Sequence, residues 1–203
     1  MPSRMRILRS SLINSNCWSK RYIRRTDLPL IFSQGYNPSP RIQLAAPLPL
    51  GITSSCEIID IWMSDNQLDL QTLRTRIIQV QPPGIEVREV EYIDPNSPPL
   101  QKEVHAAEYS VALLDPTSNL DHKIATLLNS ESILRQRHGK SYDLHPLINE
   151  LSLVPDGDNT SVQFFMQLSA QEGGTGRPEE VLLALEIPPE NTRIMRTSLV
   201  YQD

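Results

Sequence analysis

The residues best suited to binding chemistry lie in one turn-rich segment, SQGYNPSPR, at residues 33–41. Its side chains offer hydrogen bonds, a stacking face and charge, and nearby arginines extend the set. The candidates are Arg24, Arg25, Ser33, Gln34, Tyr36, Asn37 and Arg41. Two X-Pro steps favour extended backbone and stiffen the loop. The segment is typical of a recognition loop for a nucleotide, an RNA backbone or a partner protein, and equally of a tight turn that serves geometry alone.

Further basic residues gather in the second half of the chain. Arg135, Arg137 and Lys140 flank an expected hairpin turn at His138-Gly139, and Arg177 lies in a glycine-rich loop, GGTGRPEE, before an expected helix. A helix N-terminus can bind phosphate, but two glutamates already occupy the positive end of this dipole, and the loop is no Walker A motif. We therefore expect a self-capped helix there. The binding candidates of this half are Arg135, Arg137, Lys140 and Arg177, and we expect the basic residues around residues 135–140 to share one face with the loop at 33–41.

The sequence contains no recognisable catalytic or metal-binding motif. The four histidines form neither HxxxH nor HExxH, and Cys17 and Cys56 lack the spacing of a zinc or iron–sulfur site. We predict no catalytic residue, no metal site and no cofactor in this chain. A stand-alone RNA- or nucleotide-modifying enzyme that uses Asp60, Asp143 or Arg177 stays open as an alternative. Cys17 and Cys56 could form one disulfide, but two so widely spaced cysteines favour a reduced pair and a cytoplasmic protein.

Charge is distributed unevenly along the 203 residues, whose net charge is −5. Residues 1–41 hold eight basic side chains and one acid, whereas the remainder holds 11 basic and 23 acidic groups. Such a basic arm favours an anionic partner such as RNA, or docking of the arm on its own acidic body. No apolar run approaches the roughly 18 residues of a membrane span, and the composition excludes collagen, a coiled coil and a disordered chain.

The apolar periodicity predicts an α+β protein made of two ferredoxin-like halves. Residues 1–93 form a basic N-terminal arm and the first half, residues 94–102 a Pro-rich linker, and residues 103–203 the second half. Strands are expected at residues 42–50, 57–63, 85–93, 107–114, 161–168 and 193–200, and a hairpin at 133–144. Helices are expected from Asp69 to the prolines at 82–83, from Ser118 over residues 120–128, after Asp143, and after Pro178.

The segment RRTDLPLIFSQGYNPSPRIQLAAPLPLGI, residues 24–52, resembles the radical SAM-associated domain family, whose members are encoded beside or fused to cobalamin-binding radical SAM proteins. YDLHPLINEL at 142–151, GRPEEVLLAL at 176–185 and RTSLV at 196–200 support the resemblance. It implies a non-catalytic accessory or substrate-binding domain that works with a separate radical SAM enzyme. The iron–sulfur cluster, SAM and cobalamin are then expected in that partner only. RNA is a second expected partner by analogy, and no membrane is expected.

Two departures from the family pattern affect these expectations. Family members begin with a strand and a Ser-His-Leu-Asp loop, where this chain has MRILRSSLINSNCWS, and His145 stands where an arginine is expected. We therefore expect the first half to lack its N-terminal strand. A truncated remnant of the family is the third open alternative.

Overall fold

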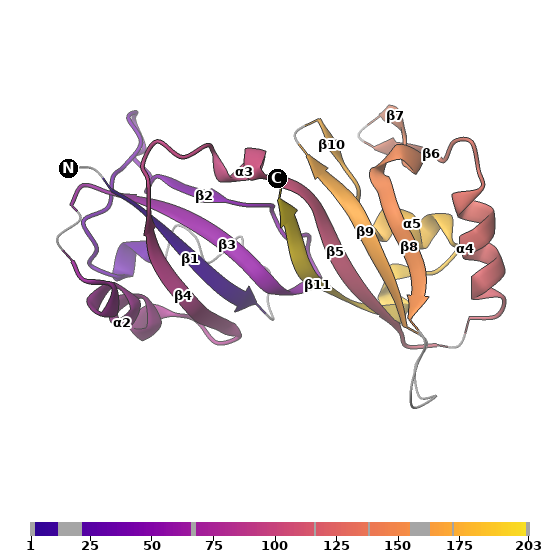
Figure 1. Cartoon of the computed structure of the whole chain (residues 1–203), viewed down its shortest axis with the longest axis horizontal. Coiled ribbons are helices and arrows are strands. Elements are labelled where there is room, and N and C mark those ends of the chain that lie inside the picture. The colour runs from indigo at the N-terminus through magenta and orange to yellow at the C-terminus, as the bar shows by residue number, and fades with distance from the viewer. Residues whose placement is uncertain are drawn as a thin grey trace. The chain divides into compact units, whose positions relative to one another are not determined.

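The computed structural model describes residues 3–11, 22–65, 68–115, 117–137, 139–154, 163–171 and 173–201. The chain divides into two units, Met1–Glu103 and Val104–Asp203, each with its own strands and helices (Figure 1). The protein belongs to the α+β class, as predicted. Among the described residues, no helix has the length and apolar character needed to cross a membrane.

In the first unit, four strands pair in the order β2-β3-β1-β4, and every pair is antiparallel. The strands are β1 (Ser3–Ser11), β2 (Ile42–Leu44), β3 (Thr53–Met63) and β4 (Ile85–Ile93). The helices are the 3₁₀ turn η2 (Ile23–Arg25), α2 (Leu70–Val80) and the short α3 (Leu100–Glu103). The strand that comes first in the chain therefore lies inside the sheet, between the third and the fourth.

Strand β1 corrects the expectation that the first half lacks its N-terminal strand. Arg4 lies opposite Trp62 on one side and Ile93 on the other, so β1 is paired along both edges. Met5 and Ile7 are fully buried, and Arg4 and Arg6 alternate with them on the opposite face. The alternation is present in the sequence, but its polar positions are arginines rather than small polar residues, which made the segment resemble a solvated basic arm.

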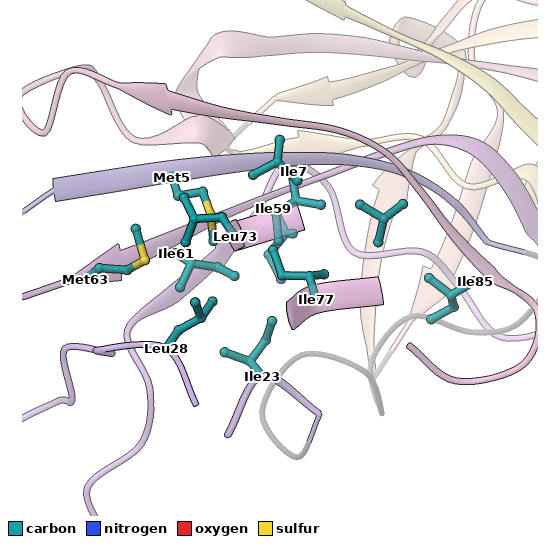
Figure 2. Close-up of a cluster of buried hydrophobic side chains, with 12 residues drawn as sticks. Met5, Ile7, Ile23, Leu28, Ile59, Ile61, Met63, Leu73, Ile77 and Ile85 are labelled. Carbon is teal, nitrogen blue, oxygen red and sulfur yellow. The ribbon is translucent and has the colours of Figure 1, made fainter. Parts of the chain in front are cut away.

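The core of the first unit lies between the sheet and α2. Figure 2 shows Met5, Ile7, Ile59 and Ile61 of the strands meeting side chains of the helix. The helical partners are Leu73 and Ile77, and Ile23, Leu28, Met63, Ile85, Val87 and Val90 complete the buried cluster. Burying each large apolar side chain contributes roughly 1.5–3 kcal/mol, so this face holds the unit together. The opposite face of the sheet carries the charged side chains of β1 and β3.

Helix α2 begins where the sequence predicts, because Asp69 caps it. The Asp69 carboxylate accepts hydrogen bonds from the Thr72 backbone N–H (2.9 Å) and from the Thr72 hydroxyl (2.6 Å). The bonds from Thr72, first from its hydroxyl and then from its N–H, hold the pKa of Asp69 below its usual value. The cap is therefore strongest in its ionised form.

Substitution of Asp69 tests this cap. We expect Asp69→Ala to lower the melting temperature at pH 7, whereas Asp69→Asn, which keeps an acceptor, should stay close to the wild type. Because the folded pKa is lowered, the contribution of Asp69 is present above the ordinary pKa of about 3.9 and is lost as pH falls through the folded pKa. Thermal melts between pH 2 and 7 measure both effects. Equal melting temperatures for the alanine and asparagine variants would contradict the assignment.

In the second unit, the main strands pair in the order β11-β5-β9-β8, again antiparallel throughout. The strands are β5 (Val104–Leu113), β6 (Leu134–Arg137), β7 (Lys140–Asp143), β8 (Ile148–Val154), β9 (Gln163–Gln171), β10 (Gly174–Thr175) and β11 (Thr192–Tyr201). The helices are α4 (Leu120–Leu128), α5 (Pro178–Ala184) and the 3₁₀ turns η3 (His145–Leu147) and η4 (Pro189–Asn191). Strands β6 and β7 form a separate hairpin. When the main strands of each unit are numbered in chain order, both sheets have the order fourth-first-third-second. This order is compatible with ferredoxin-like halves.

Several expected elements differ from the structure in physically simple ways. The strand expected at 42–50 ends at Leu44, shortly before Pro47. Residues 28–32 contribute only single bridges, Leu30 to Met63 and Phe32 to Pro40. Just before Thr26 the described helical element is the 3₁₀ turn η2, and residues 12–21 lie outside the described ranges.

The second unit also departs from two sequence expectations. After Asp143 the chain forms only a 3₁₀ turn and then the strand β8, not a helix, because β8 pairs with the edge of β9. Helix α4 begins after Asn119, which adopts the left-handed conformation (φ 58°), and makes no side-chain cap bond. The N-cap is therefore one residue later than the expected Ser118.

Candidate functional site

A cluster of four charges lies on the face of the first sheet opposite α2. Asp60, which is 0% exposed, accepts from Arg4 (Nη2 to Oδ2, 2.5 Å) and from Arg6 (Nε to Oδ1, 2.9 Å). Arg6 also reaches Glu103 (Nη2 to Oε2, 3.2 Å). The hydrogen bond to Asp60 and the nearby carboxylates raise the pKa of Arg6 further above its ordinary value. The charges of two cations and two anions thus cancel, and both carboxylate oxygens of Asp60 are engaged in ion pairs.

Arg4 ties this cluster to the Pro-rich segment. Its Nη1 donates to the carbonyl oxygens of Ser97 (2.7 Å) and Pro98 (3.1 Å), so residues 94–99, expected as a linker, are held against the first unit. Nε of Arg4 is buried and has no hydrogen-bond partner among the described residues. A buried donor left without an acceptor costs about 1–3 kcal/mol, a cost that the bonds of the other two nitrogens offset.

Trp62 of β3 is contacted by two arginines, Arg4 of β1 and Arg41, the residue that precedes β2. The guanidinium carbon of Arg4 lies 4.8 Å from the centre of the indole ring, and that of Arg41 lies 4.6 Å from it. Arg4 is opposite Trp62 in the β1–β3 register. On the other side of β3, the backbone N–H of Trp62 donates to the backbone carbonyl of Arg41 (3.1 Å). Arg41 is exposed and forms no ion pair among the described residues.

These residues line a groove of about 550 Å³ in the first unit. The lining comprises Arg4, Arg41, Ile42, Gln43, Leu44, Pro47, Trp62, Pro95, Ser97, Pro99 and Gln101. Within the described part of the chain, none of these lining residues is a carboxylate or a histidine. Guanidinium, indole and amide groups bind and orient a ligand, whereas general acid–base chemistry needs a titratable group near neutral pH. The groove is therefore equipped for binding.

The loop at residues 33–41 leads directly into this groove. It is closed at its base by the Ser33 N–H to the Ser39 carbonyl (2.8 Å) and by the Ser39 N–H to the Ser33 hydroxyl oxygen (3.1 Å). Arg24 donates from Nη2 to the Pro38 carbonyl (2.8 Å). Gly35 has φ 139°, a conformation that favours glycine. The result is a fixed loop that presents Tyr36, which is 100% exposed, at its tip.

In the second unit, the β6–β7 hairpin gathers a second group of cations. Arg135 pairs with Tyr142 and Arg137 with Lys140 in the hairpin register. Arg135 also forms an ion pair with Glu180 of α5 (Nε to Oε2, 2.6 Å). Burial and then Glu180 raise the pKa of Tyr142, and the positive charges of Arg135, Arg137 and Arg177 oppose that rise.

Three of the four predicted cations of the second unit, Arg135, Arg137 and Arg177, lie near Tyr142, and Arg135 pairs with Glu180. Arg177 is the N-cap residue of α5, where no side-chain cap bond forms, and its buried Nε has no hydrogen-bond partner among the described residues. The glycine-rich loop thus leads into a helix whose Glu180 is engaged by Arg135.

A family model described as "Uncharacterized protein conserved in bacteria (DUF2344)" matches residues 17–178. The chain belongs to the DUF2344 family. No curated protein matches it. A solved structure similar to the DUF2344 chain is a chain of the "Crystal Structure of a Cbf5-Nop10-Gar1 Complex", with 9% identity and a TM-score of 0.47. That match covers 99% of the DUF2344 chain and 50% of the other chain, so the present chain spans half of its length.

The predicted binding residues of the DUF2344 protein fall into separate groups. Arg41 lines the groove, and Arg24, Ser33, Gln34, Tyr36 and Asn37 belong to the loop or hold it. Arg25 instead lies over the ring of Tyr22, at 6.0 Å. Arg135, Arg137, Lys140 and Arg177 belong to the other unit, so each set is described by itself.

The acids of the enzyme alternative have structural roles in this DUF2344 chain. Asp60 is held by two arginines. Asp143 accepts from the N–H of Ile133 (2.8 Å) and of His145 (3.0 Å), and these bonds hold its pKa below the usual value. Among the described residues, no group of three His, Cys, Asp or Glu could hold a metal ion.

Sequence reasoning missed Arg4, Arg6 and Trp62 as site residues. One signal was available: Asp60 stands inside the apolar run EIIDIWM, and a carboxylate in a buried strand needs a cationic partner. The identity of that partner follows from the pairing of β1 with β3, which joins residues far apart in the chain.

Proposed function

We propose that this DUF2344 protein is a non-catalytic accessory domain that binds a substrate RNA and works with a separate radical SAM enzyme. The observation that carries the binding role is the groove in which Arg41 covers Trp62, at the end of a fixed loop that presents Tyr36. Single-stranded RNA is bound by arginine and aromatic side chains that stack on bases and contact phosphates.

The radical SAM part of the proposal rests on the resemblance carried by residues 24–52. That segment includes η2, the loop and β2, and it ends beside the groove. A substrate-presenting role would explain why the most family-like part of the chain is also its binding surface. In this proposal the iron–sulfur cluster, SAM and cobalamin reside in the partner, and the complex acts in the cytoplasm, where thiols such as that of Cys56 stay reduced.

The two other readings of the sequence receive less support. A stand-alone enzyme would need a carboxylate or histidine in the groove, and the candidate Asp60 is buried under two arginines. A truncated remnant was inferred from a missing first strand, and β1 is in place. Binding without chemistry is the function that the groove supports best.

Removal of two arginines beside the loop tests RNA binding. We expect Arg24→Ala/Arg25→Ala to weaken binding of a single-stranded RNA and to flatten its salt dependence, because each lost phosphate contact lowers the log–log slope by about 0.7. Arg24 also holds Pro38, so loss of its bond should loosen the loop. Fluorescence anisotropy between 50 and 200 mM salt, a range in which phosphate contacts strongly affect affinity, measures both quantities.

The matched control is Arg74→Ala/Arg88→Ala, which removes the same charge from exposed positions on α2 and β4. Its affinity should stay within about twofold of the wild type, since screened charges away from the site contribute little. Equal affinity and slope for the wild type and the Arg24/Arg25 variant would contradict RNA binding at this loop.

The radical SAM partner requires its own experiment. Co-expression of the chain with each cobalamin-binding radical SAM protein of the same genome, followed by gel filtration, should yield one stable complex. Modification of RNA by that enzyme should then depend on the added chain. If none of these proteins forms a complex with the chain, the radical SAM part of the proposal is overturned. RNA binding is then judged by the salt series alone.

A further inference from the structure

The groove of the first unit carries one uncompensated positive charge. Arg4, Arg6, Asp60 and Glu103 neutralise one another through three ion pairs. Arg41 adds a further guanidinium to the lining and has no carboxylate partner among the described residues. A ligand with one anionic group therefore matches the charge of this groove.

The shape of the lining favours a flat ligand. The guanidinium of Arg41 is planar and lies over the indole of Trp62, so the two groups together form an extended stacking surface. Pro47, Pro95 and Pro99 contribute apolar ring faces to the walls. Arginine planes and aromatic rings are the groups on which nucleobases stack in proteins.

Of the two arginines in the lining, Arg41 is the one that is open to a ligand. Arg4 is 1% exposed, its Nε is buried, and its other two guanidinium nitrogens are occupied by Asp60, Ser97 and Pro98. Arg41 is exposed, so its guanidinium can pair with an anionic group. The volume of about 550 Å³ lies within the roughly 300–1,000 Å³ of small-ligand sites.

We propose that this groove binds a single nucleotide, whose phosphate pairs with Arg41 and whose base packs against the ring faces of the lining. The nucleotide is either free or an unstacked unit of RNA. The RNA case rests on the proposed function, because it names the part of the substrate that the domain holds. The groove assignment itself requires only the nucleotide.

Trp62 provides a direct reporter of the groove. The chain has two tryptophans, and a Trp18→Phe background leaves Trp62 as the sole one. The probes are uridine and adenosine 5′-monophosphates, the two nucleosides and inorganic phosphate. We expect a saturable fluorescence change with at least one monophosphate, and binding about tenfold or more weaker for its nucleoside and for phosphate, since each lacks one half of the contacts. Equal affinity for phosphate alone would overturn the nucleotide assignment.

Arg41 is the position to vary, because Arg4 also supports the fold. Arg41→Ala should weaken binding of the monophosphate about tenfold or more, and Arg41→Lys should restore part of it by keeping the charge. The matched control, Arg74→Ala, lies on α2 at the opposite face of the sheet and should bind like the wild type. Equilibrium dialysis with labelled nucleotide avoids any change in Trp62 fluorescence caused by the substitution itself. Unchanged affinity in Arg41→Ala would overturn the proposal.

A competition experiment distinguishes a free nucleotide from a nucleotide unit of RNA. It also tests the groove assignment separately from the proposed function. Displacement of labelled nucleotide by a short single-stranded RNA assigns the groove to a unit of RNA, and displacement by free nucleotides alone assigns it to a small ligand. Nucleotide binding without any RNA binding overturns the proposed function and leaves the groove assignment standing. RNA binding that depends on Arg24 and Arg25, without nucleotide binding, overturns the groove assignment only.

Discussion

Replacement of Asp60 with alanine should lower the free energy of unfolding by about 3–5 kcal/mol, the usual cost of removing one partner of a buried ion pair. Asp60 is 0% exposed and accepts from both Arg4 and Arg6. The substitution leaves the Arg4 guanidinium, which is 1% exposed, buried without its counter-ion. Urea unfolding followed by circular dichroism measures the loss, and hydrogen exchange of the β1 and β3 amides locates it.

Two companion variants make this prediction specific. Glu89→Ala removes a carboxylate from an exposed position on β4 and should change stability by no more than about 0.5 kcal/mol. Arg4→Met/Asp60→Leu removes the first pair together and should recover most of the loss, because the penalty comes from the unpaired charge. A double variant as unstable as Asp60→Ala would show that packing, rather than charge, explains the effect.

The second large loss of folding stability is expected in the other unit, on substitution of Phe164 in β9. This side chain is 0% exposed, and its strand lies between β5 and β8, with Phe164 opposite Val111 and Leu153. Phe164→Ala removes the ring and leaves a cavity, which should lower the free energy of unfolding by about 3–5 kcal/mol. Urea unfolding with hydrogen exchange of the β5 and β9 amides is the measurement.

The adjacent Phe165 is the natural control for this variant. It points to the other face of β9 and is only half-buried. Phe165→Ala deletes the same atoms, but neighbouring solvent can fill the space, so its loss should be clearly smaller. Equal losses at the two positions would contradict the location of the core on the Phe164 face.

Elements with clear periodicity and clear ends were predicted well from the sequence. Helix α2 lies between Asp69 and the prolines at 82–83, and β4 spans the alternating residues 85–93 as expected. The β6–β7 hairpin and α4 also occupy their predicted positions. For α2, β4 and the hairpin a local signal, such as a cap, a proline or a glycine turn, coincides with the apolar pattern, so no distant contact is needed to define the element. For α4 the apolar pattern alone was sufficient.

Elements defined by distant partners were not predictable in this way. Strand β1 is stabilised by β3 and β4, and its arginines are polar-face residues only because Asp60 and Glu103 lie beside them. The same holds for the candidate site. The loop and Arg41 were identified from residue types, whereas the groove depends on Arg4 and Trp62, which become neighbours only through strand pairing.

The place of β1 inside its sheet has a consequence for synthesis on the ribosome. Arg4 is made well before its neighbours Trp62 and Ile93, which follow much later in the chain. The apolar face of β1, with Met5 and Ile7, must wait uncovered until β3, α2 and β4 have left the exit tunnel. The strand order fourth-first-third-second repeats this delay in the second unit, where β5 waits for β9 and β11. Each unit therefore folds in one late step, after its last strand emerges, and such non-local pairing makes that step slow and exposed to aggregation.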